Sequence, residues 1–477
     1  MNPKNINHAK VGSTLTPVHS LALLVFSIVL YNVRTEPTWF NHNLFTWLAL
    51  ATYILRLFNW IARGNRIISL FSIFVIYSLF SNIGQSILFS FGTDQSSLKI
   101  YSYHNLSEIC EMLKLQFLCI SGFNFGVCWY LRKSYRNVSQ MEAAKSYNSV
   151  IRRLDEKEGG NFLFDTLFVV SFVGVFVYTI YQIRLRRTMS YHDLYTSREL
   201  LSAIFSYGTI VLGLYYVFKK RYVNFILFMW LWFLVAYFVA GTRSMGIIYF
   251  GALFFILPII KPEFFRKRTY IIWAIAAVLG LASINILSEM RTSSIGSASS
   301  LSATDLDIAI FNSINEMGAS EYPTIVTMSE VERGHDYPQT ILYYLLLGFI
   351  PSGLLDALVP KSWTIQLGAW ATEAVDSSYE IGYSWIAESY FNYGSYAWLF
   401  TMLYGWFIAM AENYSLRIIN NGQKLLALCL LAFLCKQIFF ARGQIYLSIS
   451  FYRYSIILAI VYFLFGYKRK NKSIVKF

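Results

Sequence analysis

The chain has 477 residues, of which 56% are hydrophobic, 18% are aromatic and only 14% are charged. Ordinary soluble domains contain about 45–50% apolar and about 25% charged residues, so this composition excludes a string of soluble domains. The net charge of +14 does not indicate nucleic-acid binding, because no nucleic-acid-binding motif is present and the basic residues gather beside apolar runs. There they are expected to face the anionic headgroups of a lipid bilayer.

A membrane-spanning helix needs about 20 mostly apolar residues, and twelve runs approach or reach that length. In chain order they are 17–33, 44–62, 67–91, 109–131, 161–183, 199–218, 222–240, 244–260, 269–289, 384–410, 423–440 and 444–466. The predicted fold is therefore an all-α polytopic membrane protein with about 12 transmembrane helices. Its parts are a short segment over 1–16, a transmembrane domain over 17–466 with one large loop over 290–383, and a basic tail over 467–477.

The distribution of lysine and arginine predicts the orientation of these spans, because cytoplasmic segments carry an excess of both. An even number of spans places the two termini on one side, and most of the 40 basic residues then lie on that side. We therefore expect cytoplasmic termini and an extracytoplasmic loop over 290–383. The run 341–359 is almost long enough to span, but it contains Gly348, Pro351 and Gly353. We expect it to lie on or dip into the outer leaflet, although the sequence leaves a full span open.

A set of arginines lies at the outer ends of spans, where the orientation rule does not explain them. They are Arg184, Arg186, Arg187, Arg198, Arg243, Arg291, Arg442 and, inside the last span, Arg453. A guanidinium group stays charged in a partly dry site and binds phosphate oxygens through two parallel donors. This pattern indicates a site for a lipid-linked phosphate or diphosphate. The simpler alternative, in which each arginine extends to headgroups or pairs with an acid, is weakest for Arg453, because a charge inside a span is costly.

Two glutamates stand out among the acidic residues of the outer side, because apolar residues and glycine flank them. They are Glu316 in the large loop and Glu388 at the start of the run 384–410. The other loop carboxylates, Glu321 among them, are expected to be solvated. No known metal-ligand spacing, glycine-rich phosphate loop or nucleophile motif occurs in the sequence. We therefore predict no metal site and no cofactor.

Five short motifs occur in a characteristic order along the chain. They are AGTRSMG at 240–246, NSINEMGASEYPT at 312–324, IP at 350–351, GYSWIAESYFNYGSY at 382–396 and FFARGQIYLSISFYRYS at 439–455. Together with the number of spans and the large outer loop, this pattern resembles the bacterial O-antigen and capsule repeat-unit polymerases (Wzy-type). The resemblance covers nearly the whole chain, and it depends on the order of the motifs more than on any one of them.

The resemblance implies a fold similar to the C-type membrane glycosyltransferases and the O-antigen ligases. It also implies an enzyme of the bacterial cytoplasmic (inner) membrane that joins undecaprenyl-diphosphate-linked oligosaccharide units into O-antigen or capsular polysaccharide. Its partners would include a flippase and a chain-length regulator. By motif, Arg243 and Arg442 would lie at the diphosphate or sugar site, and Glu316 and Glu388 would be the acidic site residues. Arg187, Arg291 and Arg453 are further candidates for substrate binding, and the run that contains Arg187 is matched less firmly.

Two alternatives stay open at this point. Within the same enzyme class, an O-antigen ligase or another lipid-phosphate-sugar-dependent glycosyltransferase would use similar residues. In a different class, a flippase or transporter for lipid-linked oligosaccharides would also place arginines within the membrane. The absence of an internal repeat and the length of the loop over 290–383 disfavour the transporter, because transporter folds are often built from repeats around a central site.

Overall fold

The computed structural model describes residues 16–62, 69–134, 162–185, 200–218, 306–332, 340–347, 367–375, 382–420 and 434–443, with residues 224–225, 228–229, 429–430, 445, 455–457 and 460 in addition. Within these ranges every regular element is a helix, as the sequence predicts. The elements in chain order are α1 (Pro17–Asn32), α2 (Trp39–Ala62), α3 (Leu70–Ser90), η2 (Gln95–Ser97), α4 (Lys99–Tyr103), α5 (Leu106–Ser134), α7 (Phe162–Leu185), α9 (Leu200–Phe218), α13 (Leu306–Gly318), α14 (Glu321–Glu332), α15 (Thr340–Leu347), α17 (Leu367–Ala374), α18 (Trp385–Tyr393), η7 (Gly394–Tyr396), α19 (Ala397–Asn420) and η8 (Ile438–Arg442).

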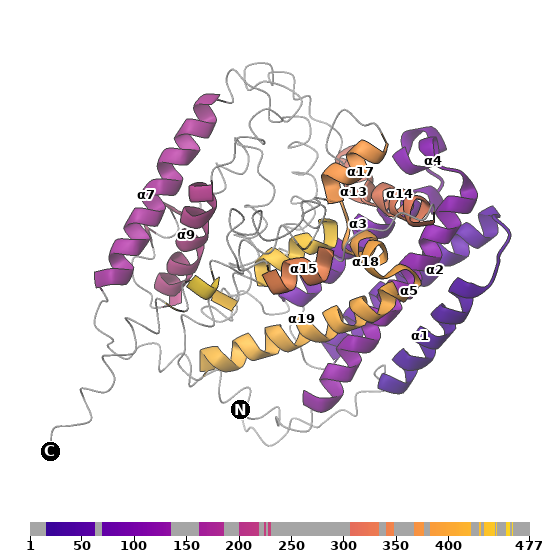
Figure 1. The fold of residues 1–477 in the computed structure, drawn as a ribbon, viewed down its shortest axis with the longest axis horizontal. Helices are drawn as coiled ribbons and strands as arrows, with labels where there is room; N and C mark the ends of the chain where they lie inside the picture. The colour runs from indigo at the N-terminus through magenta and orange to yellow at the C-terminus, as the bar shows by residue number, and fades with distance from the viewer. Residues whose placement is uncertain are drawn as a thin grey trace.

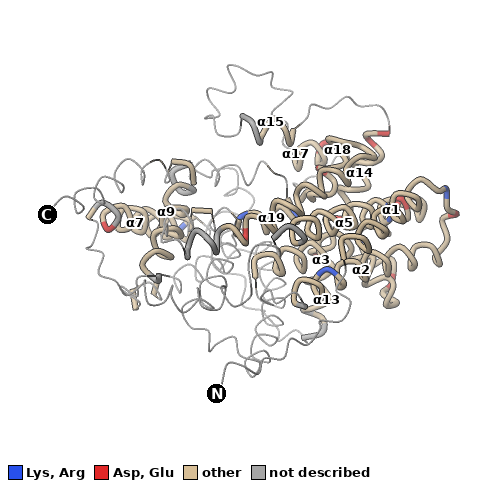
Figure 2. The backbone as a smooth tube through the Cα atoms, turned by 90° about the horizontal axis from the view of Figure 1, so that it is seen from below, with Lys and Arg blue, Asp and Glu red and all other residues tan. Residues whose placement is uncertain are grey.

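Several of these helices have the length and composition of membrane spans. In the part of the chain that the structure describes, four helical segments are long and apolar enough to cross a membrane: 39–61, 70–90, 106–131 and 165–185. Figure 2 shows that charged residues are few and scattered along the described helices. Apolar side chains such as Val25 on α1 and Val177 on α7 are exposed. Such a surface is compatible with lipid and not with water, so the chain is a multi-pass membrane protein.

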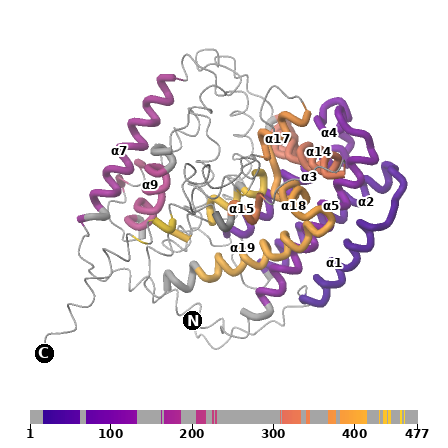
Figure 3. The backbone as a smooth tube through the Cα atoms, in the orientation of Figure 1, coloured from indigo at the N-terminus to yellow at the C-terminus, as the bar shows by residue number. Residues whose placement is uncertain are grey.

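Helix α5 lies at the centre of the larger group of helices, where it packs against α1, α2 and α19 (Figure 1). Helices α7 and α9 pack against each other and lie away from this group in both Figure 1 and Figure 2. The C-terminal helices α18 and α19 lie beside the N-terminal helices α3 and α5, so segments far apart in the sequence form one core (Figure 3). The candidate site is built on this core.

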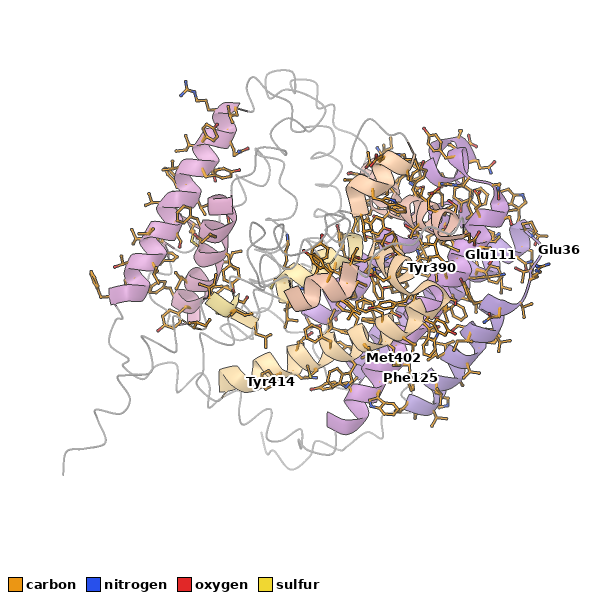
Figure 4. The ribbon with its side chains drawn as sticks, in the orientation of Figure 1. Glu36, Glu111, Phe125, Tyr390, Met402 and Tyr414 are labelled. Atoms are coloured by element: carbon orange, nitrogen blue, oxygen red, sulfur yellow. The ribbon has the colours of Figure 1, made fainter. Side chains whose placement is uncertain are left out.

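The contact between α5 and α19 depends on glycine. A methyl group at Gly122 of α5 would lie 2.6 Å from the carbonyl oxygen of Trp398, and one at Gly126 would overlap the carbonyl oxygen of Met402. Met402 of α19 and Phe125 of α5, the residue before Gly126, are labelled in Figure 4. Glycines spaced four residues apart allow two membrane helices to approach closely enough for their backbones to touch.

Helix α3 is broken near its C-terminal end. Ile83 has φ −134° and ψ 16°, which is not helical, so α3 consists of two helical pieces that meet at this residue. Gly84 follows the break, and a methyl group there would lie 3.1 Å from the carbonyl oxygen of Ile314 and 3.2 Å from the Cα atom of Gly318. The break therefore lies directly against the last turn of α13.

The run 384–410, which the sequence analysis treats as one span, contains two helices. Helix α18 ends at Gly394, whose φ of +54° belongs to the left-handed region that favours glycine. A short 3₁₀ turn, η7, then leads into α19. With nine residues, α18 is too short to cross a membrane by itself. The run 341–359 is described only as far as α15, and its remainder lies outside the described residues.

Candidate active site

Glu388 lies in the first turn of α18, and its side chain is fully buried. The helix begins there because the Ser384 hydroxyl accepts a hydrogen bond from the backbone N–H of Ala387 at 3.1 Å, which is a common N-terminal cap. The Oε2 atom of Glu388 accepts a hydrogen bond from the backbone N–H of Ile445 at 2.7 Å. Ile445 follows Arg442 by three residues, so this bond ties the ARGQI segment to α18.

Arg442 is the last residue of η8 and is partly exposed. Its Nε atom lies beside Gly382, since a methyl group at that glycine would be 3.9 Å from Nε. Two sequence motifs predicted to be functional, GYSWIAESYFNYG and ARGQ, are therefore adjacent in the structure. Among the described residues, the ion pairs do not include one between Glu388 and Arg442. Glu388 thus holds the backbone that carries Arg442 and does not neutralise the guanidinium group.

Helix α14 joins the large loop to the start of α18. The hydroxyl groups of Thr324 and Ser384 are 3.2 Å apart, and those of Thr327 and Tyr383 are 2.6 Å apart. All four side chains are buried. The second and fourth motifs of the sequence analysis, which are separated by about sixty residues, therefore form one packed unit.

Glu316 lies in the last turn of α13 and is half-buried. The residue before it is fixed against α3, because the side-chain amide of Gln85 donates to the carbonyl oxygen of Asn315 at 3.0 Å and to its Oδ1 atom at 2.8 Å. The side chain of Asn315 in turn donates to the carbonyl oxygen of Ser97 at 3.0 Å. This turn of α13 is thus attached to two separate segments of the N-terminal half.

Glu321 corrects one expectation of the sequence analysis, which treated it as a solvated loop carboxylate. It is fully buried, and its Oε1 atom accepts hydrogen bonds from the backbone N–H groups of Gln85 and Ser86 at 2.6 and 3.4 Å. Its Oε2 atom is bonded to the Ser86 hydroxyl at 2.6 Å. Burial raises the pKa of Glu321 to about 8, against the opposing effect of these three bonds. The sequence contains one signal for a buried polar partner here, the pair Gln85 and Ser86 inside the apolar run 67–91.

Six of the eight predicted arginines lie outside the described residues: Arg186, Arg187, Arg198, Arg243, Arg291 and Arg453. The structure therefore brings Arg442 and its segment against the motif over 382–396, which contains Glu388. It places Glu316 on the neighbouring α13–α14 unit. The contribution of the other arginines to this site stays a prediction.

A buried cation that the sequence analysis did not single out is Lys114 of α5. Its Nζ atom donates to the carbonyl oxygen of Val33 at 2.9 Å and forms an ion pair with Glu111 at 2.7 Å. Buried charges are tolerated where hydrogen bonds and an opposite charge compensate them. Lys114 thus links the end of α1 to α5, and it has the contacts of a structural residue.

Within the described ranges, no three side chains of the types His, Cys, Asp and Glu gather closely enough to hold a metal ion. The two most buried acids of the site region, Glu321 and Glu388, accept hydrogen bonds from backbone amides instead.

The described part of the chain is an all-helical membrane domain in which the buried Glu388 fixes the segment that carries Arg442. These features define a multi-pass membrane protein. The sequence matches the family O-antigen polysaccharide polymerase Wzy over residues 17–473, nearly its full length, and the chain belongs to this family. The resemblance drawn from the five motifs is thereby confirmed. No curated protein and no solved structure matches the chain significantly.

Proposed function

We propose that this protein polymerises undecaprenyl-diphosphate-linked oligosaccharide repeat units into O-antigen or capsular polysaccharide at the outer face of the cytoplasmic membrane. Its membership of the polymerase family supports the overall reaction. The observation that carries the site assignment is the hydrogen bond from Ile445 to the buried Glu388, because it holds the segment of Arg442 against the motif over 382–396.

The proposed reaction is a single displacement at the anomeric carbon of the growing, lipid-linked chain. A hydroxyl oxygen at the non-reducing end of a new unit forms the bond to that carbon, and the bond from the carbon to the lipid diphosphate breaks. The diphosphate leaves with the electron pair, and Glu316 receives the hydroxyl proton as general base. One displacement inverts the anomeric configuration.

Arg442 and Arg243 are proposed to bind the diphosphate and to stabilise the negative charge that develops as it leaves. Arg187, Arg291 and Arg453 would extend this positive site. Arginine charge can replace a divalent cation in this role, so we propose that the reaction needs no added metal. Glu388 is proposed to position Arg442 through the backbone, and its fully buried carboxylate is the second candidate for the base.

The test uses the purified protein with lipid-diphosphate repeat units, and it measures polymer length on gels. R442K and R442A should both lose polymer, because lysine cannot replace the two parallel donors of guanidinium. The matched control is R34K, since Arg34 is an exposed arginine of the loop between α1 and α2. Full polymer from R442K would contradict the diphosphate role. Activity that EDTA abolishes and Mg²⁺ restores would contradict the metal-free mechanism.

The finer architecture is part of the same proposal: about 12 spans in an arrangement similar to C-type membrane glycosyltransferases, with cytoplasmic termini. Reporter fusions near residues 145, 310 and 470 should read inside, outside and inside. A cytoplasmic reading at 310 would contradict the proposal, because Glu316 would then lie on the wrong side of the membrane.

Deletion of the gene separates the alternatives. Loss of a polymerase leaves single repeat units on the surface or on the lipid carrier, whereas loss of a flippase leaves lipid-linked units facing the cytoplasm. Loss of a ligase leaves full-length polymer on the carrier. The flippase and chain-length regulator proposed as partners would be sought by co-purification with the intact protein.

A further inference from the structure

The break in α3 creates a second helix N-terminus inside the protein. Residues that follow a non-helical position lack the carbonyl partners that an unbroken helix provides, and Ile83 occupies that position in α3. The backbone N–H groups of Gln85 and Ser86 both point to the Oε1 atom of Glu321, at 2.6 and 3.4 Å. Glu321 thus caps the C-terminal piece of α3 from a helix that lies some 235 residues later.

The same break fixes the turn that carries Glu316. Gln85 bonds to Glu321 through its backbone and to Asn315 through its side chain. The Oε1 atom of Gln85 also accepts a hydrogen bond from the backbone N–H of Ile100 at 3.0 Å. One residue of α3 therefore connects Glu321 with the residue immediately before Glu316.

The turn between α13 and α14 fits this break without spare room. A methyl group at Gly318 would lie 2.5 Å from the backbone nitrogen of Gln85. Glu321 cannot shift towards α3 without moving Gly318, because only two residues separate them. The position of Glu316 is thus coupled to the length and hydrogen bonding of the Glu321 side chain.

We propose that Glu321 is a positioning residue for the polymerase reaction, which holds Glu316 in place by capping the broken α3. This inference rests on the proposed role of Glu316 as the base. Glu321 itself would touch neither substrate nor the reacting atoms.

According to this proposal, the length and the acceptor oxygen of the Glu321 side chain matter, and its charge does not. With the carboxyl group protonated, Oε1 still accepts from both amides, and Oε2 exchanges donor and acceptor roles with the Ser86 hydroxyl. E321Q preserves this shape and an acceptor oxygen. E321D retains the acid but shortens the side chain by one methylene group, so it cannot reach both amides from the same helix position.

The experiment compares E321Q and E321D with the wild-type protein, and E332D serves as the matched control because Glu332 is an exposed residue of the same helix. E321Q should retain kcat within about threefold. E321D should lower kcat by roughly 10²-fold, the effect of misplacing a catalytic group by about 1 Å, with KM little changed. In an E316Q background, E321D should cause no further loss, because both changes remove the action of one base.

Hydrogen exchange over residues 83–90 provides a readout that does not need activity. The amides of Gln85 and Ser86 should be protected in the wild type and in E321Q, and they should exchange faster in E321D. An E321D protein with wild-type kcat, or a folded E321Q protein as inactive as E316Q, would overturn the proposal. A wild-type protein that makes no polymer yet shows this exchange pattern would instead contradict the proposed function and the role given to Glu316, while the capping by Glu321 would stand.

Discussion

The Oε2 atom of Glu412, in α19, accepts a hydrogen bond from the backbone N–H of Phe71 at the start of α3, at 2.9 Å. Each of the two helical pieces of α3 has an N-terminus with free backbone N–H groups. Glutamates from the C-terminal half accept from both of them, Glu412 at the start of α3 and Glu321 at the break. A glutamate oxygen at such a position accepts from the N–H groups that a helix N-terminus leaves without a partner.

Removal of the Glu412 cap should destabilise the protein without acting on chemistry. We expect E412A to lower the free energy of unfolding by about 1–3 kcal/mol, the cost of leaving a buried donor without its partner. E412Q should have a smaller effect, because its carbonyl oxygen still accepts from Phe71. Thermal unfolding in detergent, followed by tryptophan fluorescence, measures both, with the exposed Glu373 replaced by alanine as the control.

Replacement of Glu316 by glutamine should abolish most activity and leave the fold unchanged. Loss of a general base commonly lowers the rate by about 10²–10⁴-fold, whereas the side chain keeps its size. The measurement is the single-turnover rate of glycosyl transfer to a lipid-linked acceptor. E373Q, in an exposed part of the same loop, should retain the wild-type rate, and a fully active E316Q protein would show that the base is another group.

Replacement of Glu388 distinguishes a positioning role from acid–base chemistry. E388Q keeps an oxygen that can accept from Ile445, so we expect most activity to remain, while E388A should lose it. If Glu388 acts by holding the segment of Arg442, the double variant E388A/R442A should be no less active than R442A alone. An inactive but stable E388Q protein would favour Glu388 as the base.

Gly318 should not accept a side chain. In G318A the new methyl group would lie 2.5 Å from the backbone nitrogen of Gln85, so α13 and the break in α3 would have to separate. We expect the free energy of unfolding to fall by about 1–3 kcal/mol, as in overpacked cores, and the unfolding temperature to fall with it. G382A is the control, because its methyl group would meet only one atom at an ordinary contact distance of 3.9 Å.

The buried carboxyl group of Glu321 predicts a pH dependence of stability. Its pKa is about 8 in the folded protein and near 4.5 when unfolded, so the folded state binds the proton more tightly between these values. The contribution of the protonated Glu321 to the stability of the folded state is complete below about pH 4.5 and declines as the pH rises towards 8. Unfolding temperatures measured from pH 5 to pH 9 should therefore fall more steeply for the wild type than for E321Q. Parallel curves would contradict the buried, protonated state.

The apolar helices were the part of the fold that could be predicted from the sequence, because length and hydropathy alone specify a span. The predicted run 67–91 corresponds closely to α3, and 199–218 to α9. The break at Ile83 could not be predicted, because the glutamate that accepts from the amides after it is distant in the sequence. The division of 384–410 did carry a local signal in Gly394, which the continuous apolar pattern concealed.

For the candidate site, residue type and motif order indicated Glu316, Glu388 and Arg442. They did not indicate how these residues are held. Glu321 and Glu316 belong to the same short motif, and composition cannot tell a buried cap from a half-exposed acid. That distinction depends on which backbone amides lie nearby, which only the packing of α3 against α13 determines.

The glycine contact between α5 and α19 has a consequence for how the chain is made. Gly122 and Gly126 leave the ribosome and enter the bilayer long before Trp398 and Met402, whose backbone covers them in the finished protein. During this interval the glycine face of α5 is uncovered, and another membrane helix with small residues could pack against it. Assembly of the core must therefore be completed late, after insertion of the last third of the chain, and truncated products should be substrates for membrane quality control.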